Sequence, residues 1–274
     1  MADVQWFFPH TLAEVPPLLA QEGVIPHGGG TGILRGGMSQ VRGLIDLGRL
    51  GLEGVRRDKS AVSIGAATSY AAVARAVASG DPRHVLARSL AAAATTPLRN
   101  RITVGGSIAL FPYWSDLVGP LLALDAELQL MGSHEGWVPV SEYVRRRELR
   151  QGSLITEVRW REAGWSGEYR RWTRTKTDRP AFSLTVLAGK SAKAPVDLRV
   201  VLVGCSGRFR RLAEVEEAVA NGSTAAAAAA RAEIEIAGRM GASGEYLSHC
   251  AQVELERALS ALLGSRRKNT GRGR

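Results

Sequence analysis

Two glycine-rich stretches contain the residue types that bind phosphate. Residues 28–32 are Gly-Gly-Gly-Thr-Gly, and residues 103–107 are Thr-Val-Gly-Gly-Ser. Because glycine has no Cβ, backbone N–H groups in such stretches can approach a pyrophosphate closely, and consecutive amides can form an anion-binding nest. Neither stretch matches GxGxxG after a strand or GxxxxGK[ST]. A single loop of this kind is most often a tight turn. Two in one domain, each predicted to follow an apolar strand, suit a ligand with two phosphates held between them.

Other site chemistries have little support. The five histidines show neither HxxxH nor HExxH spacing, so we expect no metal site. Ser206 lies in GCSGR rather than GxSxG, and two cysteines are too few for an iron–sulfur cluster. A disulfide between Cys205 and Cys250 and two thiols in a reducing compartment both stay open. His27 could contact or covalently hold a cofactor, although a polar loop residue is the preferred interpretation. These residues indicate a phosphate-bearing cofactor that supplies the chemistry itself.

Alternating short elements are predicted around the two stretches. Thr11 and Glu14 have the spacing of a capping box, which predicts a helix over 11–21. Apolar periodicity predicts strands over 24–26, 43–47, 61–65, 127–131, 137–140 and 154–160, and helices over 69–79, 84–94 and 117–124. The pattern then changes to three strands over 168–175, 182–188 and 196–203, followed by three helices, the last over 246–263. We therefore predict a mixed α/β domain over 1–163, a domain with an antiparallel sheet and helices over 164–264, and a disordered basic tail over 265–274.

The charge is concentrated in two segments. The 274 residues carry 36 Lys and Arg against 26 Asp and Glu, a net charge of +10, and a hydrophobic content of 45% excludes a fully disordered chain. Residues 145–179 hold 11 basic and five acidic side chains, and the tail holds five basic residues and no acidic one. A basic surface suits nucleic acid, an anionic membrane surface, an acidic ligand or a partner subunit. No nucleic-acid-binding motif is present, so we expect no nucleic-acid partner.

The first residues and the hydropathy argue for a cytoplasmic protein. Asp3 and the run Trp6, Phe7, Phe8 stand where a signal peptide needs basic residues and then a long apolar segment. No stretch of 18 continuous apolar residues occurs, so no membrane span is expected.

The glycine stretches also carry a family resemblance. The segment PHGGGTGILRGG, followed by GLIDL, resembles the first flavin loop of the FAD-binding (medium) subunit of molybdenum hydroxylases. The segment LRNRITVGGSIALFPYWSDLVGPLLALDAEL is similar to that family's second segment, including the aspartate ten residues after the second glycine. Further on, LITEVRW resembles the strand that closes the flavin domain, and YRRWTRT with AFSLTVLAG resembles the start of the C-terminal domain. The resemblance covers about residues 4–262.

The resemblance implies a fold, a cofactor and partners. The fold is α+β, with a PCMH-type two-lobed α/β FAD-binding domain followed by a three-stranded antiparallel sheet and helices. The implied function is electron transfer from iron–sulfur clusters through FAD to an external acceptor, in a complex with a molybdopterin-binding large subunit and a 2Fe–2S small subunit. The pyrophosphate of FAD would lie between Gly28, Gly29, Gly30, Thr31 and Gly32 on one side and Thr103, Gly105, Gly106 and Ser107 on the other. Asp116 would hydrogen-bond the sugar part of the cofactor.

Three residues of the YRRWTRT segment are further candidates. Either Arg171 or Arg174 could offset negative charge near the flavin or its phosphates, and Trp172 could pack against the ring system. The alternative is an exposed basic strand with an aromatic side chain packed under it.

Some positions depart from the family pattern. Gly32 replaces an aspartate, Ser107 an asparagine, Tyr113 a proline, and Ala181 stands in place of an aspartate. Each loss removes a side-chain contact worth on the order of 1 kcal/mol. A second hypothesis is therefore a diverged subunit that binds FAD weakly or not at all and serves as a scaffold of such a complex.

Overall fold

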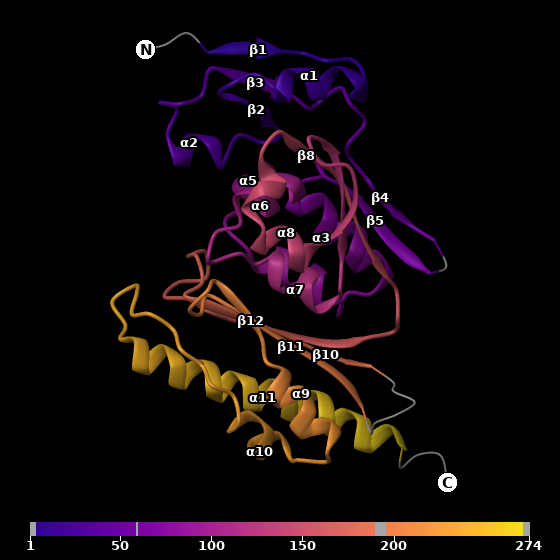
Figure 1. Ribbon diagram of the computed structural model, residues 1–274. Coiled ribbons are helices and arrows are strands. Elements are labelled where there is room, and N and C mark those ends of the chain that lie inside the picture. The colour runs from indigo at the N-terminus through magenta and orange to yellow at the C-terminus, as the bar shows by residue number, and fades with distance from the viewer. Residues whose placement is uncertain (1–3, 59, 190–195, 271–274) are drawn as a thin grey trace. The chain divides into compact units, whose positions relative to one another are not determined.

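The computed structural model describes residues 4–58, 60–189 and 196–270, the last six as backbone only. Contacts divide the chain into two compact units (Figure 1). The first comprises Met1–Gly80, Ala94–Phe111 and Leu124–Glu162, and the second comprises Asp81–Ala93, Pro112–Ala123 and Ala163–Arg274. The last break between the units, between Glu162 and Ala163, falls next to the domain boundary predicted at 163–164. Two earlier segments nevertheless group with the C-terminal part, so the division is not the continuous one expected from the sequence.

A small parallel sheet begins the first unit and carries the first glycine stretch. Its order is β1-β3-β2, with β1 Gln5–Phe7, β2 Val24–His27 and β3 Gly43–Asp46. The connecting helices are η1 Leu12–Glu14, α1 Val15–Leu19 and α2 Ile33–Gly36. The capping box of Thr11 and Glu14 forms as predicted. Buried side chains such as Val15, Leu19 and Ile45 make the core beneath this sheet.

A five-stranded antiparallel sheet completes the first unit. Its order is β4-β5-β8-β6-β7, with β4 Val55–Arg57, β5 Ala61–Gly65, β8 Ser153–Arg161, β6 Glu127–Gly132 and β7 Gly136–Pro139. The helices of this part are α3 Tyr70–Gly80, α5 Thr96–Arg99, α6 Val104–Leu110, α8 Val140–Arg145 and η2 Arg147–Arg150. The predicted strands over 61–65, 127–131, 137–140 and 154–160 are confirmed to within a residue or two.

The second glycine stretch was predicted to follow a strand, and this was wrong. Thr103 makes only an isolated bridge with Ser69, and residues 104–107 form the first turns of α6. The Thr103 hydroxyl caps this helix by accepting from the amide of Gly106. Two glycines lower intrinsic helix propensity, but an N-cap and tertiary contacts outweigh that cost.

The second unit is built on a four-stranded antiparallel sheet rather than the predicted three strands. Its order is β12-β11-β10-β9, with β9 Ser166–Trp172, β10 Phe182–Gly189, β11 Asp197–Val203 and β12 Phe209–Arg211. The fourth strand escaped prediction because three residues after a turn carry no measurable alternation. The α+β class and the antiparallel sheet with helices are confirmed.

Helices cover both faces of this sheet. On one face lie α9 Ala213–Ala220, α10 Ala225–Ala229 and α11 Gly244–Thr270, around an apolar core that includes Leu184, Leu202, Leu255 and Leu259 (Figure 1). Helix α7 Val118–Ala123 packs against β10 and β11, and α4 Val85–Ala92 packs against β9. These contacts explain why the segments 81–93 and 112–123 belong to the second unit. Both Cys205 and Cys250 are free thiols.

The predicted disordered tail begins too early. Helix α11 continues to Thr270, past the predicted end at residue 263. Extending an existing helix is much cheaper than starting one, which accounts for the extra turns. Residues 271–274 of the predicted tail lie outside the described residues.

Candidate functional site

The first glycine stretch is a loop that leaves its backbone donors unused. It connects β2 to α2, and Gly30 has a φ of +73°, a conformation that favours glycine. None of the amides of residues 28–32 donates a hydrogen bond to another residue that the structure describes. The loop nevertheless lies half-buried for most of its length. Consecutive unpaired amides are the donor set that binds phosphate oxygens.

This loop packs directly on the chain that leads into the second glycine stretch. A Cβ added at Gly29 would lie 1.6 Å from the backbone oxygen of Arg101, and one at Gly28 would lie 3.0 Å from the Thr103 hydroxyl. The Arg101 guanidinium donates to the Gly29 carbonyl through Nε at 3.3 Å and Nη2 at 3.1 Å. The two glycine stretches therefore lie side by side in the first unit.

In the second glycine stretch, the amides of residues 104–107 donate hydrogen bonds within the protein. The amide of Val104 donates to the carbonyl of Thr68 at 3.0 Å, and that of Gly105 donates to the carbonyl of Ala66 at 2.8 Å. The Gly106 amide donates to the Thr103 hydroxyl and the Ser107 amide to the Thr103 carbonyl, at 3.3 and 3.0 Å. The Ser107 hydroxyl is hydrogen-bonded to that of Tyr70. This stretch can offer hydroxyl groups to a ligand but no amide nest.

The donor set of the first unit fits a pyrophosphate. The first loop offers neutral N–H donors, and the glycines keep side chains away from them. His27 precedes this loop and makes an edge contact with the Trp6 ring, 4.9 Å between centroids. In the described part of the chain no group of three or more His, Cys, Asp or Glu side chains could hold a metal ion.

Asp116 belongs to the second unit and is nearly fully buried there, with 6% of its surface exposed. It stands just before α7, and its Oδ1 accepts from the Tyr169 hydroxyl and from Arg171 Nε at 3.0 Å. Burial raises the pKa of Asp116 to about 6, and the Arg171 guanidinium and the Tyr169 hydroxyl oppose this rise. Among the described residues, Oδ2 accepts from Arg171 Nη2 alone, at 3.4 Å, so it keeps acceptor capacity for a sugar hydroxyl.

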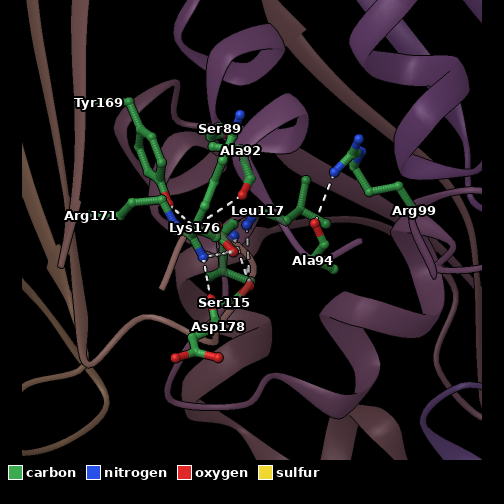
Figure 2. Close-up of polar contacts among 12 residues, drawn as sticks. Ser89, Ala92, Ala94, Arg99, Ser115, Leu117, Tyr169, Arg171, Lys176 and Asp178 are labelled. Atoms are coloured by element: carbon green, nitrogen blue, oxygen red, sulfur yellow. Dashed lines mark hydrogen bonds and ion pairs between the residues drawn. The ribbon is translucent and has the colours of Figure 1, made fainter. Parts of the chain in front are cut away.

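Every N–H group of the Arg171 guanidinium donates a hydrogen bond within the protein. Nε bonds Asp116, Nη1 donates to the carbonyls of Ala92 and Lys176 at 2.8 and 3.1 Å, and Nη2 donates to Asp116 and to the Asp178 carbonyl at 2.8 Å (Figure 2). A guanidinium has five N–H groups, and five bonds are present. Arg171 thus joins β9, the end of α4 and the loop that follows β9.

Trp172 lies on the other face of the same sheet. Successive residues of a strand point to opposite faces, and Trp172 packs against the apolar core and contacts Tyr246 of α11, 6.1 Å between ring centroids. The structure therefore separates Trp172 from Arg171 and Asp116. The packing of Trp172 matches one part of the alternative interpretation, an aromatic side chain packed under the strand, but Arg171 is largely buried, with 11% of its side chain exposed, rather than lying on an exposed basic strand.

Comparison with known proteins identifies the family. The model of the FAD binding domain in molybdopterin dehydrogenase matches residues 2–160, which include both glycine stretches and Asp116. The chain belongs to this family. The match confirms the resemblance seen in the two flavin segments, and it makes FAD the cofactor of this domain.

Similar proteins and solved structures extend the likeness to most of the chain. The α subunit of the 6-hydroxypseudooxynicotine dehydrogenase complex of Paenarthrobacter nicotinovorans is 26% identical over 246 residues, covering 82% of this chain and 81% of that protein. A carbon monoxide dehydrogenase structure from Hydrogenophaga pseudoflava, lacking the Mo-pyranopterin moiety, has 25% identity and a TM-score of 0.84, covering 94% and 96% of the two chains. Quinoline 2-oxidoreductase of Pseudomonas putida 86, at 20% identity and a TM-score of 0.84, covers 94% and 95% and shares the fold.

These likenesses make the chain a flavoprotein subunit of an oxidoreductase family. Within the described residues, no helix has the length and apolar character needed to cross a membrane. Three residues that contact the candidate site residues in the structure were not identified from the sequence: Tyr70, Arg101 and Tyr169. Of these, only Tyr169 had a usable signal, because it stands two residues before Arg171 and so shares its strand face.

Proposed function

We propose that this chain is the FAD-binding electron-transfer subunit of a molybdenum-containing hydroxylase or dehydrogenase. Its partners would be a molybdopterin-binding large subunit and a 2Fe–2S small subunit, with electrons passing from the iron–sulfur clusters through FAD to an external acceptor. The observation that carries the proposal is the row of unpaired amides at residues 28–32, within the region that matches the FAD-binding family.

The residues of the first unit have distinct roles in this proposal. Amides of residues 28–32 would donate to the phosphate oxygens, and the hydroxyls of Thr103 and Ser107 would lie beside them. In the second unit, Asp116 would accept from a sugar hydroxyl. Arg171 would act as a positioning residue that holds the Asp116 carboxylate, since its own donors are all in use. FAD, once bound, supplies the redox chemistry, and the protein supplies binding and orientation.

Reconstitution tests this function directly. Apoprotein incubated with FAD and desalted should keep the flavin absorption band, and expression with the neighbouring genes should copurify a molybdenum subunit and an iron–sulfur subunit. Reduction of the bound flavin by the substrate of that complex would complete the case. Protein that stays colourless after reconstitution would contradict it.

A scaffold role is the second candidate, and the second glycine stretch favours it. The amides of residues 104–107 are bound within the protein, and Gly32 and Ser107 lack the side chains of the family pattern. A colourless chain recovered in an intact complex would support this role over electron transfer. A cytoplasmic location stays a prediction from the sequence.

A further inference from the structure

Arg101 contacts the first glycine loop through both its main chain and its side chain. It lies between α5 and the helix cap Thr103, and its backbone oxygen touches Gly29 so closely that any Cβ there would overlap it. Its guanidinium donates two hydrogen bonds to the Gly29 carbonyl, at 3.1 and 3.3 Å. Arg101 is therefore in a position to hold the conformation of the first loop at Gly29.

The Arg101 charge is not neutralised in the part of the chain that the structure describes. No carboxylate lies within ion-pair distance of it, and its Nη1 has no hydrogen-bond partner there. The side chain is exposed. Arg99, two residues earlier, differs because its Nη1 and Nη2 donate to the Ala94 carbonyl and the Thr96 hydroxyl. An arginine with an unpaired charge and a free N–H edge beside unpaired amides suits an oxyanion.

We infer that Arg101 is a ligand-binding residue for the diphosphate group of the cofactor. Its two bonds to Gly29 hold the loop in the conformation that leaves the amides unpaired, and its free Nη1 edge supplies the positive charge that neutral amides lack. The inference rests on the proposed function and deepens it. It also gives a function to one positively charged residue, Arg101, that lies outside the two basic segments.

The test compares ligands with and without phosphate in the full-length apoprotein. In isothermal titration, Arg101→Gln should weaken binding of FAD and of adenosine diphosphate by about tenfold, the order expected for one charge-assisted hydrogen bond. Riboflavin, which has no phosphate, should bind within about twofold of wild type. Raising the salt concentration should weaken adenosine diphosphate binding more in wild type than in the variant. Salt screens the attraction between the Arg101 charge and the phosphates, and the variant lacks that charge.

Two further variants separate charge from folding. Arg75→Gln removes the same charge from an exposed position on α3 and should leave all three affinities within about twofold. Arg101→Lys keeps the charge but loses the double bond to Gly29, and its affinity should fall between those of wild type and Arg101→Gln. Circular dichroism and thermal melting check that each variant folds.

Three outcomes overturn the inference. Arg101→Gln that binds FAD and adenosine diphosphate as wild type does would remove Arg101 from the site while leaving the FAD-binding function intact. Equal losses for riboflavin and adenosine diphosphate would assign Arg101 to loop structure alone. Wild-type protein that binds neither FAD nor adenosine diphosphate would instead defeat the proposed function, and the inference with it.

Discussion

The two glycine stretches look alike in sequence and differ in what they leave available. Both need glycine for close packing: a Cβ at Gly29 would lie 1.6 Å from the Arg101 oxygen, and a Cβ at Gly105 would lie 2.8 Å from the Ala66 Cβ. In the second stretch, however, the amides of residues 104–107 are bound to Ala66, Thr68 and Thr103. In the first, no amide of residues 28–32 has a partner in the described chain.

The difference teaches that glycine content alone does not identify a phosphate site. Glycine permits close approach, and that approach can be made by the protein itself or by a ligand. In the second stretch the protein itself makes this close approach and binds the amides of residues 104–107. In the first stretch the protein approaches Gly29, but the amides of residues 28–32 have no partner in the described chain. A binding loop is recognised by donors left unpaired in a half-buried place, because such groups are costly unless a ligand or water satisfies them.

The largest effect is expected from Gly29→Ala. The added methyl overlaps a backbone oxygen that cannot move alone, so the two loops must separate. We expect a loss of about 3 kcal/mol in the free energy of unfolding and at least a hundredfold loss of FAD affinity. Chemical denaturation and FAD titration measure the two effects.

Gly36→Ala is the matched control for Gly29→Ala. A Cβ at Gly36 meets nothing within 4 Å, and Gly36 lies in α2, where alanine is the better helix former. It should leave binding unchanged and stability equal or slightly higher. If Gly29→Ala bound FAD as tightly as this control, the close packing of the loops would be irrelevant to binding.

A second test concerns Asp116. Like the amides of residues 104–107, its carboxylate has hydrogen-bond partners within the protein. Its pKa is about 6 in the folded state against 3.8 for the ordinary value. A raised carboxyl pKa contributes stability at low pH that is lost as pH rises through 6. The difference between the two pKa values corresponds to a decrease of about 3 kcal/mol in the free energy of unfolding from about pH 4 to about pH 7.

Asp116→Asn should remove this pH dependence. Urea denaturation across that pH range should show the free energy of unfolding of wild type falling, relative to the variant, as the pH rises. Parallel curves for the two proteins would mean that the Asp116 pKa is not raised in the folded state.

A smaller effect is expected from Gly105→Ala. Its methyl would press on the Ala66 Cβ at 2.8 Å, and we expect a loss of about 2 kcal/mol in the free energy of unfolding. FAD affinity of the folded protein should change little, because the amides of residues 104–107 are already bound within the protein. The double variant Ala66→Gly with Gly105→Ala makes room for the methyl and should recover part of the stability; failure to recover any would assign the loss to the backbone of α6.

The smallest effect is expected from Ser107→Ala. It removes the hydrogen bond to the Tyr70 hydroxyl, which should cost about 1 kcal/mol in thermal or urea denaturation. FAD affinity should stay within about threefold. A tenfold loss of affinity with unchanged stability would show that Ser107 binds the cofactor directly, and would narrow the contrast between the two stretches.

The elements with strong local signals were predictable. Strand β5 begins and ends where its apolar alternation does, and the Thr11–Glu14 capping box forms as its spacing indicates. Strand β12 was missed because three residues carry no period, and α6 was missed because its two glycines conceal a helix whose cap and neighbours stabilise it. Local propensity is a weak guide where tertiary contacts decide the backbone.

The candidate site was only half predictable. The motif residues at 28–32, 103–107 and Asp116 carry the family resemblance, and the family match includes all of them. Arg101 lies outside the glycine stretch that carries the phosphate-binding signal, so the sequence gave no reason to single it out. Trp172 was adjacent to Arg171 in sequence, but strand alternation places the two on opposite sheet faces.

The sequence by itself determined the family, the cofactor of the domain and most of the strands and helices, because these depend on motifs and on local periodicity. The tertiary structure decided which donors stay free. The carbonyls of Ala66 and Thr68 satisfy the second stretch from more than 30 residues upstream, and Arg101 fixes the first stretch from more than 70 residues downstream. Hydrogen-bond satisfaction depends on which distant segments meet, and spacing along the chain does not encode that directly.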